Sequence, residues 1–134
     1  MKSQASVEYL MIFGFVVLIT IPLIIGYFSY TSEISQRVTS SQIDTLAKKI
    51  VDSAETVYYL GEPSQTTIRA YIPNGVSSVN LSGKEIIYRV ITTTGTSDIV
   101  RISSVNLTGS LPKSQGNYLI TIKAEGGRVN VSYR

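Results

Sequence analysis

The sequence contains no cysteine and no histidine. Without cysteine the chain can form no disulfide, and it offers neither a thiolate metal ligand nor a cysteine nucleophile. Without histidine it lacks the base of every catalytic triad that relies on imidazole. These absences leave the redox compartment open, because many exported proteins have no disulfide. Metal sites and enzymes that depend on either residue are therefore excluded.

Charge is also sparse. The chain carries 12 Lys and Arg against nine Asp and Glu, which gives a formal net charge of +3. Only Lys48 and Lys49 are adjacent, so no basic patch indicates nucleic acid as a partner. A serine–lysine pair such as Ser82 and Lys84 could act as nucleophile and base, but such loop pairs more often face solvent. We expect no enzyme activity and no cofactor.

A long segment near the N-terminus has no charge at all. From Tyr9 to Ser32 most residues are Leu, Ile, Val, Phe, Met or Tyr. A helix of that length spans about 36 Å, enough for a bilayer core of about 30 Å. Pro22, Gly14 and Gly26 weaken a helix in water but are tolerated in transmembrane helices. The segment therefore predicts a membrane-spanning helix.

The next segment, residues 33–62, is amphipathic. Apolar residues recur at spacings of three and four, which predicts a helix with one buried stripe. Gly61 and Pro63 are typical of a helix end. Because no strong breaker separates the two segments, one helix of about 84 Å could run from Ala5 to Leu60. The stripe consists of Ile43, Leu46, Ala47, Ile50, Val51, Ala54, Val57 and Tyr58.

After Pro63 the hydrophobic period changes to two, which predicts strands. Glycine, proline and asparagine separate them, with turns expected at Pro73-Asn74-Gly75, Ser82-Gly83, Thr94-Gly95, Gly109, Gly116-Asn117 and Gly126-Gly127. The expected strands are Thr67–Ile72, Val76–Leu81, Glu85–Thr92, Asp98–Ser103, Tyr118–Glu125 and Arg128–Tyr133.

The last turn defines a register. A two-residue Gly126-Gly127 loop places Glu125 opposite Arg128 and Ala124 opposite Val129. One face of this hairpin is then apolar and should lie in the core. The predicted fold class is α+β: a long N-terminal hydrophobic α-helix with a C-terminal antiparallel β-sheet or sandwich domain. The amphipathic stripe is expected to pack on that sheet.

Three asparagines of the predicted β-domain begin an N-x-[ST] sequence, or sequon: Asn80, Asn106 and Asn130. Chance would give about one such sequence from five asparagines in a chain this rich in Ser and Thr. Strand alternation should turn each asparagine away from its apolar neighbours. We therefore predict N-linked glycans at these positions, which would place the β-domain outside the cell.

Glu8 helps to decide whether the first 32 residues are a secretory signal peptide, a plain membrane anchor or a segment with a further function. A secretory signal peptide has a shorter apolar run and a small-residue cleavage site, and none follows Tyr27. A plain membrane anchor fits the length of the segment but does not explain the acid at its start. Acids within membrane segments usually have a function. The alternative is that Glu8 lies at the headgroup level beside the positive end of its helix.

The first residues carry a further pattern. Met1-Lys2-Ser3 followed by "QASVEYL" resembles the class III signal peptide of archaeal type IV pilins, Q-x-S-x-E-x-x-x-L. Gln4, Ser6 and Glu8 match, and Ile12 stands where the pattern has leucine. The segment from Lys49 to Ile68 also resembles the helix-to-sheet junction of such pilins. The resemblance implies that a prepilin peptidase cuts between Ser3 and Gln4.

What the resemblance implies for the whole chain is a filament subunit. Its parts would be a removed leader (1–3), a transmembrane and filament-core helix (4–32), an amphipathic helix (33–62) and an extracellular β-domain (63–134). After cleavage the new α-amino group of Gln4 could pair with Glu8 of the same or a neighbouring subunit. Expected partners are copies of the chain in a helical homo-oligomer, the membrane before assembly, the prepilin peptidase, and a pilus assembly ATPase with its membrane platform.

Two other classes stay open. The chain could be a membrane-anchored surface protein that never polymerises, or a minor pilin. It could also be a subunit of an archaellum-like filament. The expected localisation is a membrane-anchored precursor with an extracellular β-domain, followed by a mature form in a surface filament used for adhesion.

Overall fold

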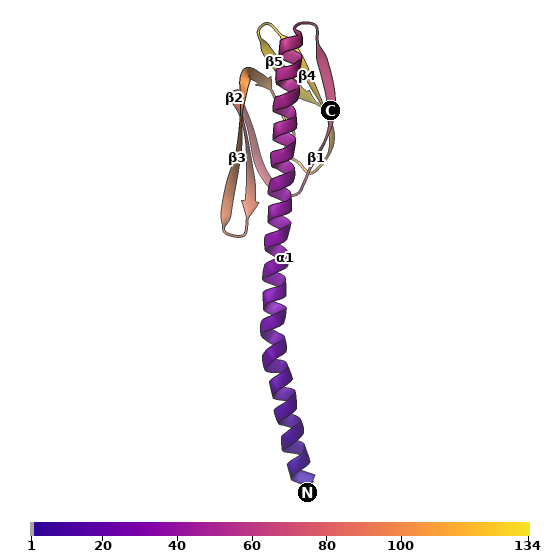
Figure 1. Ribbon diagram of the computed structural model, residues 1–134, viewed down its shortest axis with the longest axis vertical. Helices are drawn as coiled ribbons and strands as arrows, with labels where there is room; N and C mark the ends of the chain where they lie inside the picture. The colour runs from indigo at the N-terminus through magenta and orange to yellow at the C-terminus, as the bar shows by residue number, and fades with distance from the viewer. Residues whose placement is uncertain (1) are drawn as a thin grey trace. The chain divides into compact units, whose positions relative to one another are not determined.

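A computed structural model describes the backbone of residues 2–134 and the side chains of residues 6–134. Its elements are α1 (Lys2–Leu60), β1 (Gln65–Ile72), β2 (Val76–Thr92), β3 (Gly95–Gly109), β4 (Gly116–Glu125) and β5 (Arg128–Tyr133) (Figure 1). The chain divides into two compact units, Met1–Ser35 and Gln36–Arg134. The predicted α+β class, with its long apolar N-terminal helix, is confirmed and is consistent with a pilin-like fold.

Helix α1 is continuous, as the lack of a strong breaker predicted. Pro22 lies inside it without ending it. The helix ends at Leu60, where Gly61 adopts a positive φ of 76° and its N–H donates to the carbonyl of Tyr58 at 3.1 Å. A glycine in this conformation is the usual C-terminal cap of a helix. The predicted end at Gly61 is confirmed.

The strands form one mixed sheet in the order β1-β4-β5-β3-β2. The prediction of a wholly antiparallel sheet or a sandwich is wrong in one respect: β3 and β5 pair in parallel, with Leu107 opposite Val129. Strand β5 lies between β4 and β3, and the Gly126-Gly127 turn makes it run antiparallel to β4. In that direction it runs parallel to β3. The other three pairings between strands are antiparallel.

Strand β2 folds back on itself. The N–H of Ile91 donates to the carbonyl of Gly75 at 2.7 Å, yet a straight strand would separate these residues by about 50 Å. Gly83, near the middle of β2, has a positive φ of 59° and marks a shift in the register with β3. The two predicted strands, Val76–Leu81 and Glu85–Thr92, are therefore two arms of β2 joined near the predicted Ser82-Gly83 turn.

The final hairpin has the predicted register, with Ala124 opposite Val129 and Glu125 opposite Arg128. The turn expected at Gly116-Asn117 is wrong. These two residues are the first of β4 and pair with Ile72 and Tyr71 of β1. The chain had already changed direction in residues 110–115, where no regular element is formed.

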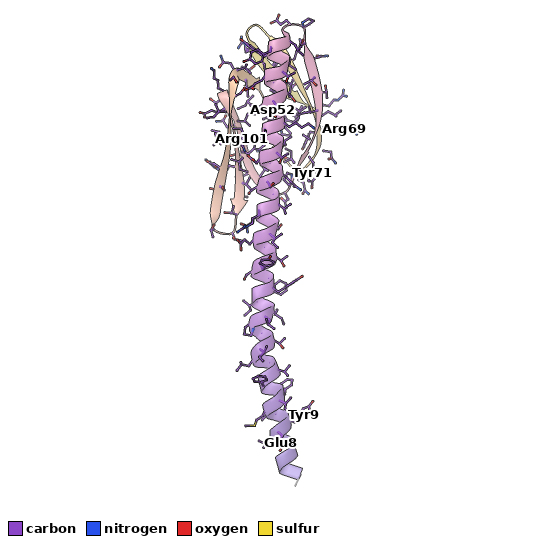
Figure 2. The ribbon with its side chains drawn as sticks, in the orientation of Figure 1. Glu8, Tyr9, Asp52, Arg69, Tyr71 and Arg101 are labelled. Carbon is purple, nitrogen blue, oxygen red and sulfur yellow. The ribbon has the colours of Figure 1, made fainter. Side chains whose placement is uncertain are left out.

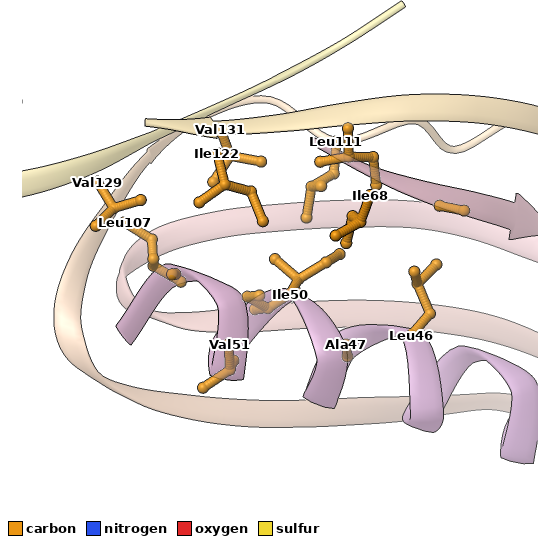
Figure 3. Packing of buried hydrophobic residues seen from close by; sticks show 14 of the residues in the cluster. Leu46, Ala47, Ile50, Val51, Ile68, Leu107, Leu111, Ile122, Val129 and Val131 are labelled. Carbon is orange, nitrogen blue, oxygen red and sulfur yellow. The ribbon is translucent and has the colours of Figure 1, made fainter. Parts of the chain in front are cut away.

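The core lies between the second half of α1 and one face of the sheet. Figure 3 shows Leu46, Ala47 and Ile50 of α1 facing side chains from the strands. Every residue of the predicted stripe is buried except Tyr58, which is 36% exposed because it lies in the last turn of α1. Buried partners from the sheet and its loops include Ile68, Ile86, Tyr88, Leu107, Leu111, Ile122, Val129 and Val131.

Candidate membrane-anchoring segment and surface sites

The first unit presents apolar side chains to its surroundings. These residues lie within α1, along which Figure 2 draws the side chains as sticks. Their exposed fractions range from 43% to 73%. Leaving so many apolar side chains in water would cost on the order of tens of kcal/mol. The surface therefore requires an apolar environment. Its members are Val7, Tyr9, Leu10, Met11, Ile12, Phe13, Phe15, Val16, Leu18, Ile19, Ile21, Leu23, Ile24, Ile25, Tyr27, Phe28, Tyr30 and Ile34.

By length and composition α1 can cross a membrane, and its most apolar window has no buried residue. The helix is therefore compatible with membrane anchoring. The hydroxyls of two threonines in the segment have partners inside the helix: Thr20 donates to the carbonyl of Val16 at 2.7 Å, and Thr31 donates to the carbonyl of Tyr27 at 2.9 Å. A hydroxyl transferred into an apolar medium without such a bond would cost several kcal/mol.

The segment also contains two glycines and a proline, which affect its backbone. A Cβ added at Gly14 or Gly26 would meet no atom within 4 Å. At both positions the backbone is accessible to a neighbouring apolar helix, because glycine allows close approach. Pro22 lacks an N–H, so the carbonyl of Leu18 loses its partner within the helix.

The predicted assembly and processing residues lie at the start of α1. Glu8 is exposed, directly before the uncharged run (Figure 2). The backbone of Ser3 and Gln4 belongs to α1, but their side chains lie outside the described residues. The pairing of Glu8 with the α-amino group of Gln4, and the cut between Ser3 and Gln4, therefore stay predictions.

In the second unit, two carboxylates of α1 bind β3. Asp44 accepts two hydrogen bonds from the guanidinium of Arg101, at 2.6 and 2.7 Å. Glu55 accepts from both the backbone N–H and the hydroxyl of Ser104, at 2.9 and 2.6 Å. The bonds from Arg101 lower the pKa of Asp44, and those from Ser104 lower the pKa of Glu55. Sequence analysis missed both contacts, which join residues about 50 positions apart.

The three sequons occupy different strands. Asn80 on β2 and Asn106 on β3 are exposed. Asn130 lies on β5, which has β4 on one side and β3 on the other, and it is half-buried. Its side-chain amide donates to Glu125 at 3.4 Å. The side-chain amide is therefore accessible for glycosylation at Asn80 and Asn106, and much less accessible at Asn130.

A groove of about 600 Å³ lies between α1 and the start of β1. Lys48, Lys49 and Asp52 line one side of it, and Ser64 and Thr66 line the other. Sequence analysis indicated only the adjacent lysines. Among the side chains that the structure describes, no group of three or more acids could hold a metal ion.

Comparison with protein-family models finds no match, and neither the curated proteins nor the solved structures contain a match. Function therefore has to be argued from the residues of the chain and their placement.

Proposed function

We propose that the protein is the structural subunit of an archaeal type IV pilus. The observation that supports this most is the exposed apolar surface of α1, which follows directly on a Q-x-S-x-E pattern. An ordinary anchor needs the first feature but not the second. The α+β fold, with a sheet that packs on the second half of the same helix, fits this role.

The apolar surface would serve twice. Before assembly it holds the precursor in the bilayer, and in the filament it packs against the same surface of other copies. Both environments are apolar, so the free energy lost on leaving the membrane is recovered when the helices pack together. Repeating one head-to-tail contact that does not close produces a helical filament.

The start of the mature chain would set the register between subunits. Cleavage before Gln4 by a prepilin peptidase makes Glu8 the fifth residue and creates a positive α-amino group near it. A buried carboxylate is tolerated only when it is paired. An assembly ATPase and a membrane platform would drive the transfer of subunits from the bilayer into the filament.

The β-domain would face the outside of the cell. Lys2 favours the cytoplasmic side, because positive residues are enriched there. The exposed Asn80 and Asn106 are suited to carry N-linked glycans, which are added on the outer side. Adhesion would use this outer surface. A membrane-anchored protein that never polymerises, a minor pilin and an archaellum-like subunit are the alternatives.

The test is to shear intact cells and to determine the mass and the N-terminal peptide of the released chain. We expect a chain that begins at Gln4, in released filaments. Cells without the prepilin peptidase provide the control, in which the chain should keep Met1 and stay with the membrane. A chain that keeps Met1 and is found only in membranes of normal cells would contradict the proposal.

A further inference from the structure

The first arm of β2, residues 76–81, forms one edge of the sheet. The second arm pairs with β3 on one side, from Glu85 to Thr92. The bond between Ile91 and Gly75 brings the first arm to its other side. Since β2 is the last strand in the sheet order, nothing in the described part of the chain lies beyond this arm. Its outer backbone groups are available to another strand.

The two edges of the sheet differ in charge. β1, at the opposite edge, carries the exposed Arg69 in its middle (Figure 2). The segment 73–83, which contains the whole first arm, has no charged residue. Its six residues VSSVNL combine β-branched and apolar side chains with polar ones. An uncharged edge strand of this composition is a template for pairing with another chain, whereas a central charge prevents it.

Asn80 lies within this uncharged arm, and its side chain is exposed. We propose that Asn80 carries an N-linked oligosaccharide that keeps the first arm of β2 from pairing with the same arm of a second copy. The proposal rests on the extracellular location of the β-domain argued above. The bulk and hydration of the glycan would prevent pairing at this edge, as the charge of Arg69 does at the other edge.

The modification is a glycosyl transfer from a lipid-phosphate-linked oligosaccharide. The amide nitrogen of Asn80 forms a bond with the anomeric carbon of the sugar. The bond from that carbon to the phosphate oxygen breaks, and its electron pair leaves with the lipid phosphate. The amide loses one proton to solvent, so no oxidant or reductant takes part. Leu81 and Ser82 complete the acceptor sequence.

The other two sequons lie on strands that are not the last in the sheet order. Asn130 is on β5, which lies between β4 and β3, and Asn106 is on β3 directly before Leu107, where the pairing of β3 with β5 begins. Sugars on these strands would project from a face of the sheet and leave both edges as they are. Of the three, only Asn80 lies on the uncharged arm at the end of the sheet order.

Edge-to-edge pairing can be detected by disulfide formation through one introduced cysteine, because the chain contains no cysteine of its own that could react. Two copies of one arm that pair antiparallel about a twofold axis through its middle bring the two copies of each central residue close together. Ser78 is exposed on the arm and lies outside the acceptor sequence. A single cysteine at Ser78 therefore reports pairing as a disulfide-linked dimer, measured on the full-length protein in membranes from its own cells.

The experiment compares Ser78→Cys alone with Ser78→Cys combined with Asn80→Gln or Asn80→Lys. After mild oxidation we expect the dimer fraction to rise about tenfold with Asn80→Gln, which removes the acceptor and leaves the edge uncharged. Asn80→Lys also removes the glycan but restores a charge, so its dimer fraction should stay low. A cysteine at the exposed Thr67, on the edge that Arg69 guards, should show no rise with Asn80→Gln.

Three results would overturn the proposal: an unmodified Asn80 in the mass of the native chain, an equal dimer fraction with and without Asn80→Gln, or an equal rise at Thr67. If Asn80→Gln does not fold, Ser82→Ala provides the same comparison, because it removes the acceptor sequence and leaves the edge uncharged. Release of the chain by shearing is scored separately. Filaments without a change in the dimer fraction would refute the edge role alone, and a change in the dimer fraction without filaments would refute the pilus alone.

Discussion

At the scale of single residues, Tyr88 is the most unusual member of the core. Its side chain is fully buried, and no described residue offers its hydroxyl a hydrogen bond. Burial raises the pKa of the Tyr88 phenol well above its ordinary value of 10.0. A buried hydroxyl without a partner destabilises the folded state, because it gives up its bonds to water.

Tyr88→Phe should therefore raise the free energy of unfolding by about 1 kcal/mol. The ring and its packing are kept, and only the unpaired hydroxyl is removed. Urea unfolding of the full chain in non-ionic micelles would measure the change. Tyr59→Phe is the matched control, because Tyr59 is 74% exposed and its hydroxyl should matter little. A clear loss of stability in Tyr88→Phe would mean that the hydroxyl has a partner in solution.

The three sequons allow a second prediction at this scale. Glycopeptide mass spectrometry of the native protein should find sugar on Asn80 and Asn106 but not on Asn130. Asn130 is half-buried in a central strand, and its amide is engaged by Glu125. Asn130→Gln should accordingly leave the mass of the modified protein unchanged apart from the substitution itself. A glycan on Asn130 would show that modification precedes folding of the sheet.

At the scale of elements, two carboxylates hold the second half of α1 to β3. Glu55 and Asp44 both have a lowered pKa in the folded protein, because each accepts two hydrogen bonds from β3. Their stabilising effect is fully present above the pKa of the unfolded chain. It is lost as the pH falls through the lower pKa of the folded state. Stability should therefore decline from about pH 5 toward pH 2.

Glu55→Gln should reduce this dependence on pH. At pH 7 we expect a loss of about 1 kcal/mol, which is less than a hydrogen bond to a charge usually contributes, because Glu55 is partly exposed. Below pH 3 the variant and the native protein should converge. Thermal unfolding of the full chain in micelles across this range measures both effects. Glu85→Gln serves as control, because Glu85 is exposed and has no described partner. An unchanged pH profile in Glu55→Gln would exclude the contact with Ser104.

At the scale of the whole molecule, the exposed apolar surface of α1 is the dominant feature. A chain with this surface is stable in a bilayer or beside other copies of itself, but not alone in water. In the proposed filament, Glu8 is the acid at the start of this surface that would be carried into that apolar environment. Its partner would be the α-amino group created by cleavage before Gln4.

Glu8→Ala should leave the precursor in the membrane and abolish assembly. Removing one member of a buried ion pair leaves the other charge unpaired, so release by shearing should fall at least tenfold, or ~1.4 kcal/mol per assembly step. Quantifying the chain in the sheared and membrane fractions measures this. Glu85→Ala, a substitution on the exposed surface of β2, should assemble normally. Filaments of Glu8→Ala at the native level would exclude the pairing.

Much of this architecture could be predicted from sequence because it depends on local periodicity. The uncharged run of residues 9–32, the stripe from Ile43 to Val57 and the Gly126-Gly127 hairpin are each visible as a pattern of neighbouring residues. Each is set by interactions within one helix or between adjacent strands. The structure confirms the continuous helix, the buried stripe and the hairpin register.

The sequence by itself determined the elements, the apolar surface and the sequons, because each is a property of consecutive residues. Only the tertiary structure decided that β5 lies beside β3 in parallel, that Asn130 is half-buried, and that the first arm of β2 is an edge. It also decided that Glu55 reaches Ser104. These features depend on contacts between residues far apart in the chain, whose partners are chosen by packing the whole sheet on α1, and no local pattern encodes that choice.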